Sequence, residues 1–167
     1  MTTRANYTPD EWKTLMLAPV QAGMTVMLAD HSGLVGSAQE TMALYNATNK
    51  SVARQYADNP LIKDLLAGDN KDMQNFVFQT VGTYIKDANA RQQMKPQTLQ
   101  MCSRVASILK QKAAPQEAMG YKQWLLDVSS YVANAAKEEG GEKVSPVEAA
   151  TIKEIANALD VRQAPMY

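Results

Sequence analysis

The sequence predicts an all-α fold, a single-domain bundle of six to eight helices around a buried apolar first helix. Apolar residues recur at helical spacing between clear start signals along most of the chain. In contrast, no window of four to eight residues alternates apolar and polar side chains between turns. No linker or low-complexity segment divides the chain, so we expect one domain over residues 1–167, with tails at 1–7 and 161–167.

The composition excludes several classes of partner and compartment. Seventeen basic residues balance seventeen acidic ones, so no net field attracts nucleic acid or an anionic membrane. Cys102 is the only cysteine, which excludes a disulfide framework and a cysteine-based zinc site and indicates a reducing compartment. The polar N-terminus resembles no secretory signal, and we therefore expect a cytoplasmic protein.

The first helix is predicted over Pro9–Ala29. Thr8 and Glu11 form a capping box around Pro9 at the first helical position. The sixteen residues from Thr14 to Ala29 carry no charge, but about 20 apolar residues are needed to cross a bilayer. This run also contains polar and helix-breaking residues: Pro19, Gln21, Gly23 and Thr25. It therefore predicts a core helix with no transmembrane segment, kinked at Pro19.

The later helices are predicted from their start signals. These are Ser37, Asn59–Pro60, Asp69 or Asn70, Pro96, Pro115 and Ser145–Pro146. We expect the second helix to break near Asn49 and the third to end on Gly68 in a left-handed conformation. In the helix after Pro115, helical spacing places Met119, Trp124 and Tyr131 in the core.

Two connecting segments share one pattern: an acid, a glycine three residues later, a serine four after that, and a glutamate three further on. The first runs from Asp30 to Glu40, and the second from Glu138 to Glu148. Both are typical of helix-to-helix turns in which Ser and Glu form a capping box. Alternatively, the carboxylates converge on a divalent cation, since hard cations prefer oxygen ligands. The ligands would then be Asp30, Glu40, Glu138 or Glu139, and Glu148.

The same segments resemble tellurite-resistance domains of the TerB type. That family's hallmark is an Ala-Asp-Gly helix end followed by a small residue and a Glu, used twice. Residues 141–148 look like the second unit, and Ala29–Asp30 with Gly33 and Glu40 like the first. His31 and Ser32 separate Asp30 from its glycine, and Asp160 stands where the family pattern favours Gly. The resemblance implies a role in stress response and a Ca²⁺- or Mg²⁺-binding acidic surface at Asp30 and Glu139.

No residues are predicted to be catalytic. His31 is the only histidine, and Ser32 and Ser37 lie too close to it in sequence for a catalytic triad. Cys102 lies on an apolar stripe, where a free cysteine usually acts as a small buried hydrophobe. The chain also lacks a phosphate-binding loop and the common hydrolase motifs.

Three functions remain open from the sequence. We favour a non-enzymatic module that binds a partner protein, in a stress setting if the TerB resemblance holds. The first alternative is a bundle that binds an apolar small molecule or pigment near Met16, Met24 and Met27, although these methionines are also typical core fillers. The second is a TerB-like cation-binding protein. The cofactor-binding residues are unknown, no cofactor other than Ca²⁺ or Mg²⁺ is expected, and a homo-oligomer is compatible with the sequence.

Overall fold

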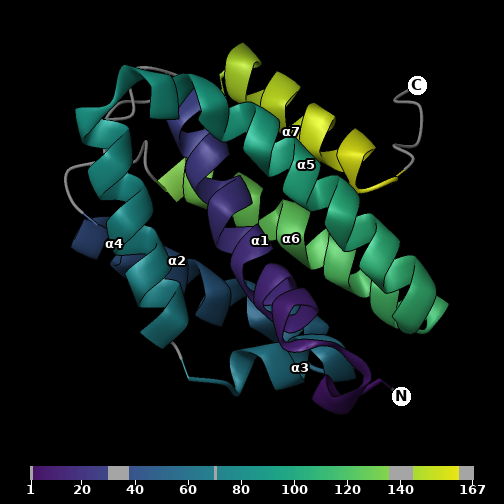
Figure 1. Cartoon of the computed structure of the whole chain (residues 1–167). Helices are drawn as coiled ribbons and strands as arrows, with labels where there is room; N and C mark the ends of the chain where they lie inside the picture. The colour runs from purple at the N-terminus through teal and green to yellow at the C-terminus, as the bar shows by residue number, and fades with distance from the viewer. Residues whose placement is uncertain (1, 30–37, 70, 136–144, 162–167) are drawn as a thin grey trace.

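The computed structural model describes residues 2–29, 38–69, 71–135 and 145–161, and it confirms the predicted all-α class (Figure 1). Within these ranges the chain forms seven α-helices, two short 3₁₀ turns at Arg4–Asn6 and Arg54–Tyr56, and no strand. The helices are α1 (Pro9–Ala29), α2 (Ala38–Ala53), α3 (Pro60–Leu66), α4 (Lys71–Lys86), α5 (Ala88–Lys112), α6 (Pro115–Ala135) and α7 (Pro146–Ala158).

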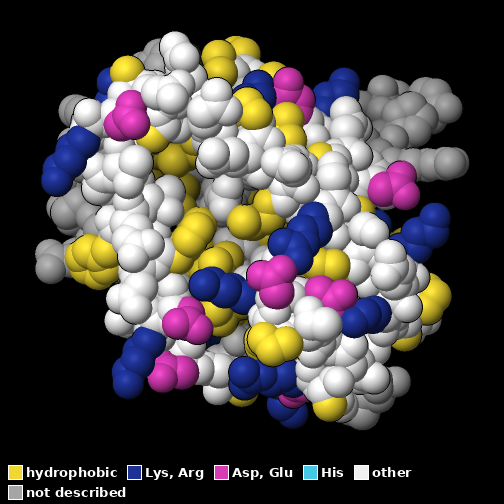
Figure 2. Space-filling model, in the orientation of Figure 1, with side chains coloured by type: hydrophobic (Ala, Val, Ile, Leu, Met, Phe, Trp, Pro, Cys, Tyr) yellow, Lys and Arg dark blue, Asp and Glu magenta, His cyan; other side chains and the backbone are white. Residues whose placement is uncertain are grey.

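Helix α1 is the centre of the bundle, as predicted, and contacts α2, α4, α5, α6 and α7. Val20 and Met24 are each 1% exposed and Met27 is also buried, whereas Met16 is half-buried. No helix in the described part of the chain has the length and apolar character needed to cross a membrane. Between α4 and α5 the surface is hollowed, and hydrophobic side chains show at the bottom of the hollow (Figure 2).

Two of the predicted capping boxes are present. The amide of Thr8 donates to Glu11 Oε2 at 2.8 Å, and the amide of Glu11 donates to Thr8 Oγ1 at 3.2 Å. At the start of α7, Ser145 and Glu148 exchange the same pair of bonds, at 2.8 and 3.3 Å. The third box begins at Ser37, which lies outside the described residues.

Helix α3 is joined to α6 through its capping residue. Asn59 Oδ1 accepts from the amides of Leu61 and Ile62, as expected for an N-cap before a proline. Its Nδ2 donates to the carbonyl oxygen of Glu117 at 3.1 Å. A Cβ added to Gly120 would lie 2.4 Å from this Nδ2 atom. An alanine here would therefore displace the Asn59 amide from its present position.

Three predicted helix boundaries are wrong. Pro96 lies inside α5, because the helix begins at Ala88, eight residues before the predicted start. Asp87 caps it, and its Oδ1 accepts from the Asn89 amide at 2.8 Å. Helix α2 continues past Asn49, which stays in the core and accepts from Trp124 Nε1 at 3.2 Å. Gly68 is not left-handed: α3 ends at Leu66, and its C-terminal cap is Ala67 in a right-handed conformation.

Two predicted core residues of α6 are instead on the surface. Met119 is 73% exposed, because it lies two residues before the buried Tyr121 and so points to the other side of the helix. Tyr131 is 48% exposed, which a tyrosine tolerates because its hydroxyl group can bond water. The buried face of α6 is formed by Tyr121, Trp124, Leu125 and Val128.

The N-terminal residues 2–7, which the sequence suggests are a tail, pack against the bundle. The ring of Tyr7 is 7% exposed and lies 5.6 Å from the ring of Trp12. The amide of Thr2 lies 3.3 Å from both carboxylate oxygens of the buried Glu117, and its hydroxyl also bonds that carboxylate. Hydrogen bonds therefore attach this segment to the start of α6.

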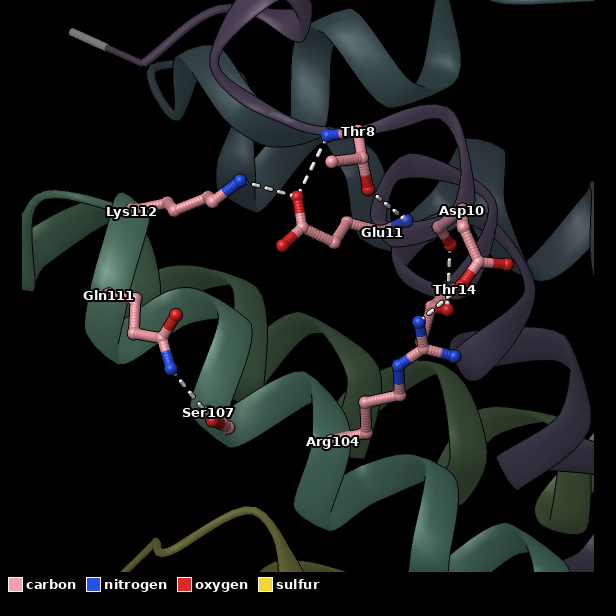
Figure 3. A network of polar contacts seen from close by, with 8 residues as sticks. All are labelled: Thr8, Asp10, Glu11, Thr14, Arg104, Ser107, Gln111 and Lys112. Carbon is pink, nitrogen blue, oxygen red and sulfur yellow. Dashed lines mark hydrogen bonds and ion pairs between the residues drawn. The ribbon is translucent and has the colours of Figure 1, made fainter.

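The start of α1 is also tied to the second half of α5 by two ion pairs (Figure 3). Arg104 pairs with Asp10, and Lys112 Nζ lies 2.5 Å from Glu11 Oε2. The Glu11 carboxylate thus closes its own capping box and binds α5 at the same time. The ammonium group of Lys112, together with the Thr8 amide, lowers the pKa of Glu11 below its ordinary value.

Candidate binding groove

Helices α1, α4 and α5 line a groove made of two adjoining hollows, of about 440 and 310 Å³. Tyr84 of α4 and Met94 of α5 line both hollows, so the two adjoin, and we call them together the α1–α4–α5 groove. Leu28 adds apolar surface to the larger hollow and Phe76 to the smaller one. Residues of α4 and α5 form most of the wall of the smaller hollow, and these two helices border the hollowed face in Figure 2.

A sharp reversal of the chain between α4 and α5 places these two helices next to each other as walls of the groove. Asp87 alone separates α4 from α5, and its side chain caps α5. On α4, Phe76, Thr80, Thr83 and Tyr84 line the groove, a spacing that places them along one face of the helix.

The floor of the groove carries a closed ring of hydrogen bonds between buried polar groups of α1 and α5. Gln21 Nε2 donates to Thr98 Oγ1 at 3.1 Å, and Thr25 Oγ1 donates to the carbonyl oxygen of Gln21 at 2.8 Å. Because Thr25 uses its only proton in this way, Thr98 donates in the 2.7 Å bond between the two hydroxyl groups. All three residues are buried: Gln21 is 7% exposed, Thr25 is 4% exposed and Thr98 is 1% exposed.

Gln21 has one polar atom left over from this ring. No hydrogen bond to its Oε1 is found among the described residues, and Gln21 lines the smaller hollow. The ring fixes the amide in place, so the groove floor offers an oriented acceptor. The sequence contains a signal for this feature, because Gln21 and Thr25 are four residues apart and therefore share one face of an otherwise apolar helix.

The larger hollow has a cationic edge formed by Arg91 and Lys95. Arg91 Nη1 donates to the carbonyl oxygen of Tyr84 at 2.9 Å, and its guanidinium carbon lies 5.9 Å from the centre of the Tyr84 ring. Lys95 forms an ion pair with Glu154 of α7. In the part of the chain that the structure describes, no carboxylate lines either hollow.

Of the acidic residues that the sequence suggests as cation ligands, only Glu148 has a described side chain. Glu148 is 1% exposed and serves as the capping partner of Ser145. Asp30, Glu138 and Glu139 lie outside the described residues, as does the side chain of Glu40. Among described residues no cluster of three acidic, cysteine or histidine side chains is found. The cation site therefore stays a prediction.

The remaining candidates from the sequence lie away from the groove or outside the described residues. Cys102 is 1% exposed, and burial raises the pKa of its thiol to about 12. His31 lies outside the described residues. Neither hollow is lined by Met16, Met24 or Met27; the methionine that lines both is Met94.

Comparison with models of protein families, with curated proteins and with solved structures found no match to this chain. A function for this chain is therefore proposed from the groove and its side chains.

Proposed function

We propose that this chain is a non-enzymatic binding module that holds a small amphipathic molecule in the α1–α4–α5 groove. Pockets for such ligands usually measure about 300–1,000 Å³ and combine apolar walls with a few fixed polar groups. The two hollows, at about 440 and 310 Å³, fall in this range. Their apolar walls come from Leu28, Phe76, Tyr84 and Met94.

The observation that carries the proposal is the hydrogen-bond ring on the groove floor. Polar side chains inside an apolar core are costly unless they are paired, and here the ring pairs Gln21, Thr25 and Thr98 with one another. A core that needed only stability would be served by apolar side chains at these positions. The ring instead holds the Gln21 amide at the floor of an open hollow, where it would orient a ligand.

A partner protein, the function that the sequence analysis favours, would use a different kind of surface. The large apolar side chains that are exposed in the described residues are Leu66, Phe78, Met119, Tyr131 and Val147. They belong to α3, α4, α6 and α7, with two at opposite ends of α6. Single exposed apolar residues of this kind are ordinary on soluble domains. These scattered side chains do not form a face for a partner, and the test below distinguishes a partner helix in the groove from a small ligand.

The test uses N-phenyl-1-naphthylamine, a neutral amphipathic dye whose fluorescence rises in apolar surroundings. Ala88 lines the larger hollow and Ala90 the smaller, so Ala88→Phe and Ala90→Phe should each fill part of the groove. We expect each to weaken dye binding about tenfold or more. The control is Ala149→Phe on α7, which is exposed and lines neither hollow, and which should leave binding unchanged.

Circular dichroism and thermal melting would check that each variant remains folded. Dye binding that all three variants leave unchanged would contradict the proposal. If both groove variants remove a co-purifying protein but do not affect the dye, the groove binds a partner helix instead.

A further inference from the structure

We propose that the smaller hollow of the α1–α4–α5 groove binds an uncharged aromatic molecule whose N–H or O–H group donates a hydrogen bond to Gln21 Oε1. This inference rests on the proposed binding function and deepens it by naming the chemical class of the ligand and the bond that recognises it. Phenols, indoles and anilides belong to this class.

The direction of the Gln21 amide follows from the protons available to the hydrogen-bond ring on the groove floor. The ring contains three bonds among Gln21, Thr25 and Thr98. Each hydroxyl group supplies one proton, so the third proton must come from the NH₂ group of Gln21. A reversed amide would place Oε1 against Thr98 Oγ1 and leave the ring one proton short. The NH₂ group therefore faces Thr98, and Oε1 faces away from it.

Oε1 is the atom that Gln21 can present to the smaller hollow. Among the described residues that line this hollow, Gln21 alone belongs to α1, and the others belong to α4 and α5. Thr98, which holds the NH₂ group, lines neither hollow. Gln21 is only 7% exposed, and an acceptor in such a place gains more from a hydrogen bond than one in open water. A ligand with a donor group is therefore favoured.

The apolar lining of the smaller hollow suits an aromatic ligand. Phe76 and Tyr84 are half-buried, and Met94 is 8% exposed. Aromatic rings pack favourably against other rings, and a thioether sulfur makes favourable contacts with them as well. The volume of about 310 Å³ is at the small end of the range for ligand pockets, so a molecule of one or two fused rings fits.

The smaller hollow favours an uncharged ligand. None of the described residues that line it carries a charge. A charged group entering it would lose water without gaining a counterion on the described walls, which is costly. Of the hydroxyl groups on the α4 wall, that of Thr83 already donates to the carbonyl oxygen of Gln79 at 2.8 Å. Gln21 Oε1 is thus the fixed polar group that reads the ligand.

Indole and benzofuran test the hydrogen bond, because they share one fused-ring shape and differ in an N–H group against an oxygen. In ligand-observed NMR titrations we expect indole to bind about five- to tenfold more tightly than benzofuran. Ala90→Phe, which fills the smaller hollow, should weaken both probes about tenfold. Ala88→Phe, in the larger hollow, should change the affinity for either probe by less than about twofold.

Gln21→Met keeps the length of the side chain and removes the acceptor. This variant should reduce the preference for indole over benzofuran to less than about twofold, mainly by weakening indole. The matched control is Gln111→Met on α5. Gln111 also donates through Nε2 to a hydroxyl group, that of Ser107, but it is exposed and lines neither hollow. The control should keep the full preference.

Thr98→Val tests whether the ring sets the direction of the amide. It keeps the shape of the side chain but removes the partner of the NH₂ group, so the amide can turn and present either side to the hollow. The preference for indole should then fall to less than about twofold although Gln21 is still present. The control is Thr151→Val on α7, an equally buried threonine that lines neither hollow, and it should keep the preference.

Three indoles that differ in charge test the uncharged class. Tryptamine and indole-3-acetate carry a positive and a negative charge, and 3-ethylindole is a neutral molecule of similar size. We expect each charged compound to bind at least about threefold more weakly than 3-ethylindole. Equal binding by either charged compound would show that the ligand need not be uncharged.

The possible failures are distinguishable. If Ala90→Phe weakens both probes but indole and benzofuran bind equally well, the hydrogen bond is wrong and the proposed function stands. If Thr98→Val leaves the preference intact, the ring does not set the direction of the amide. If indole does not bind, or if Ala90→Phe does not affect its binding, the whole inference is wrong. The dye measurements with Ala88→Phe and Ala90→Phe then decide separately whether the proposed function stands.

Discussion

The hydroxyl group of Tyr121 donates a 2.6 Å hydrogen bond to the main-chain carbonyl oxygen of Leu15. In an uninterrupted helix this oxygen would accept from the amide of residue 19, but residue 19 is a proline and has no N–H group. Tyr121 and Leu15 are both fully buried, so water cannot replace the missing donor. A side chain of α6 therefore satisfies the carbonyl group that Pro19 leaves unpaired in α1.

Tyr121→Phe should lower the free energy of unfolding by about 1–3 kcal/mol, because it leaves a buried carbonyl group without a partner. In a Pro19→Ala background the same change should cost less, because the new amide of residue 19 can donate to Leu15. Urea unfolding of the four proteins in this double-mutant cycle measures the coupling. Equal costs in both backgrounds would show that the two residues act independently.

Met24→Asp should destabilise the protein by about 4 kcal/mol or more, because Met24 is 1% exposed and the new carboxylate would be buried without a partner. The matched control is Met119→Asp, at a position 73% exposed, which should change stability by no more than about 0.5 kcal/mol. Thermal melting compares the two. An unchanged melting temperature for Met24→Asp would contradict the central position of α1.

Two glycine-to-alanine changes in helices should have opposite effects. Gly120→Ala would displace the Asn59 amide from its bond to Glu117, and should cost about 1–2 kcal/mol. At Gly82 an added Cβ meets nothing within 4 Å, so alanine there should stabilise the protein by about 0.5–1 kcal/mol. Denaturant unfolding measures both. Stabilisation by Gly120→Ala would mean that Asn59 can move at no cost.

Ser145→Ala should cost about 1 kcal/mol without altering the fold, because it removes the side-chain oxygen that accepts from the Glu148 amide. Ser103→Ala, at an exposed position within α5, is the control and should be neutral or slightly stabilising. We predict the same cost as at Ser145 for Ser37→Ala, whose position lies outside the described residues. Equal stability of Ser145→Ala and the control would argue against the cap.

The Glu11–Lys112 pair should make stability depend on pH in the acid range. The pKa of Glu11 is lowered in the folded protein, so its contribution is fully present above the ordinary pKa of 4.5 and is lost as pH falls through the lower folded value. Glu11→Gln should reduce stability at pH 7 and have progressively less effect below about pH 4. Denaturant unfolding of both proteins across this pH range measures the effect. Parallel pH profiles of the free energy of unfolding would contradict the expectation.

The sequence predicts helix starts well where a proline follows a residue that can cap. Asn59 and Ser145 stand before Pro60 and Pro146, and both accept hydrogen bonds from the first turn. Pro96 follows a lysine, which cannot cap in this way, and it lies inside α5. The proline leaves the carbonyl group of Gln92 without its usual amide donor, and the helix tolerates this because Gln92 is exposed to water.

The groove could not be predicted in the same way. Its floor joins Gln21 to Thr98, which are 77 residues apart, and neither belongs to a recognisable motif. The polar residues in the apolar first helix indicate only that something must pair with them. The partner, and the open hollow above it, depend on how α4 and α5 are placed, which helical periodicity alone does not determine.

Cys102, the chain's only thiol, offers a built-in measure of how often the bundle opens. It is 1% exposed, and with a pKa raised to about 12 hardly any thiolate is present at neutral pH. A disulfide reagent can therefore react only in the moments when α5 separates from its neighbours. The labelling rate would then report the frequency of these openings in the native protein, without denaturant and without any introduced residue.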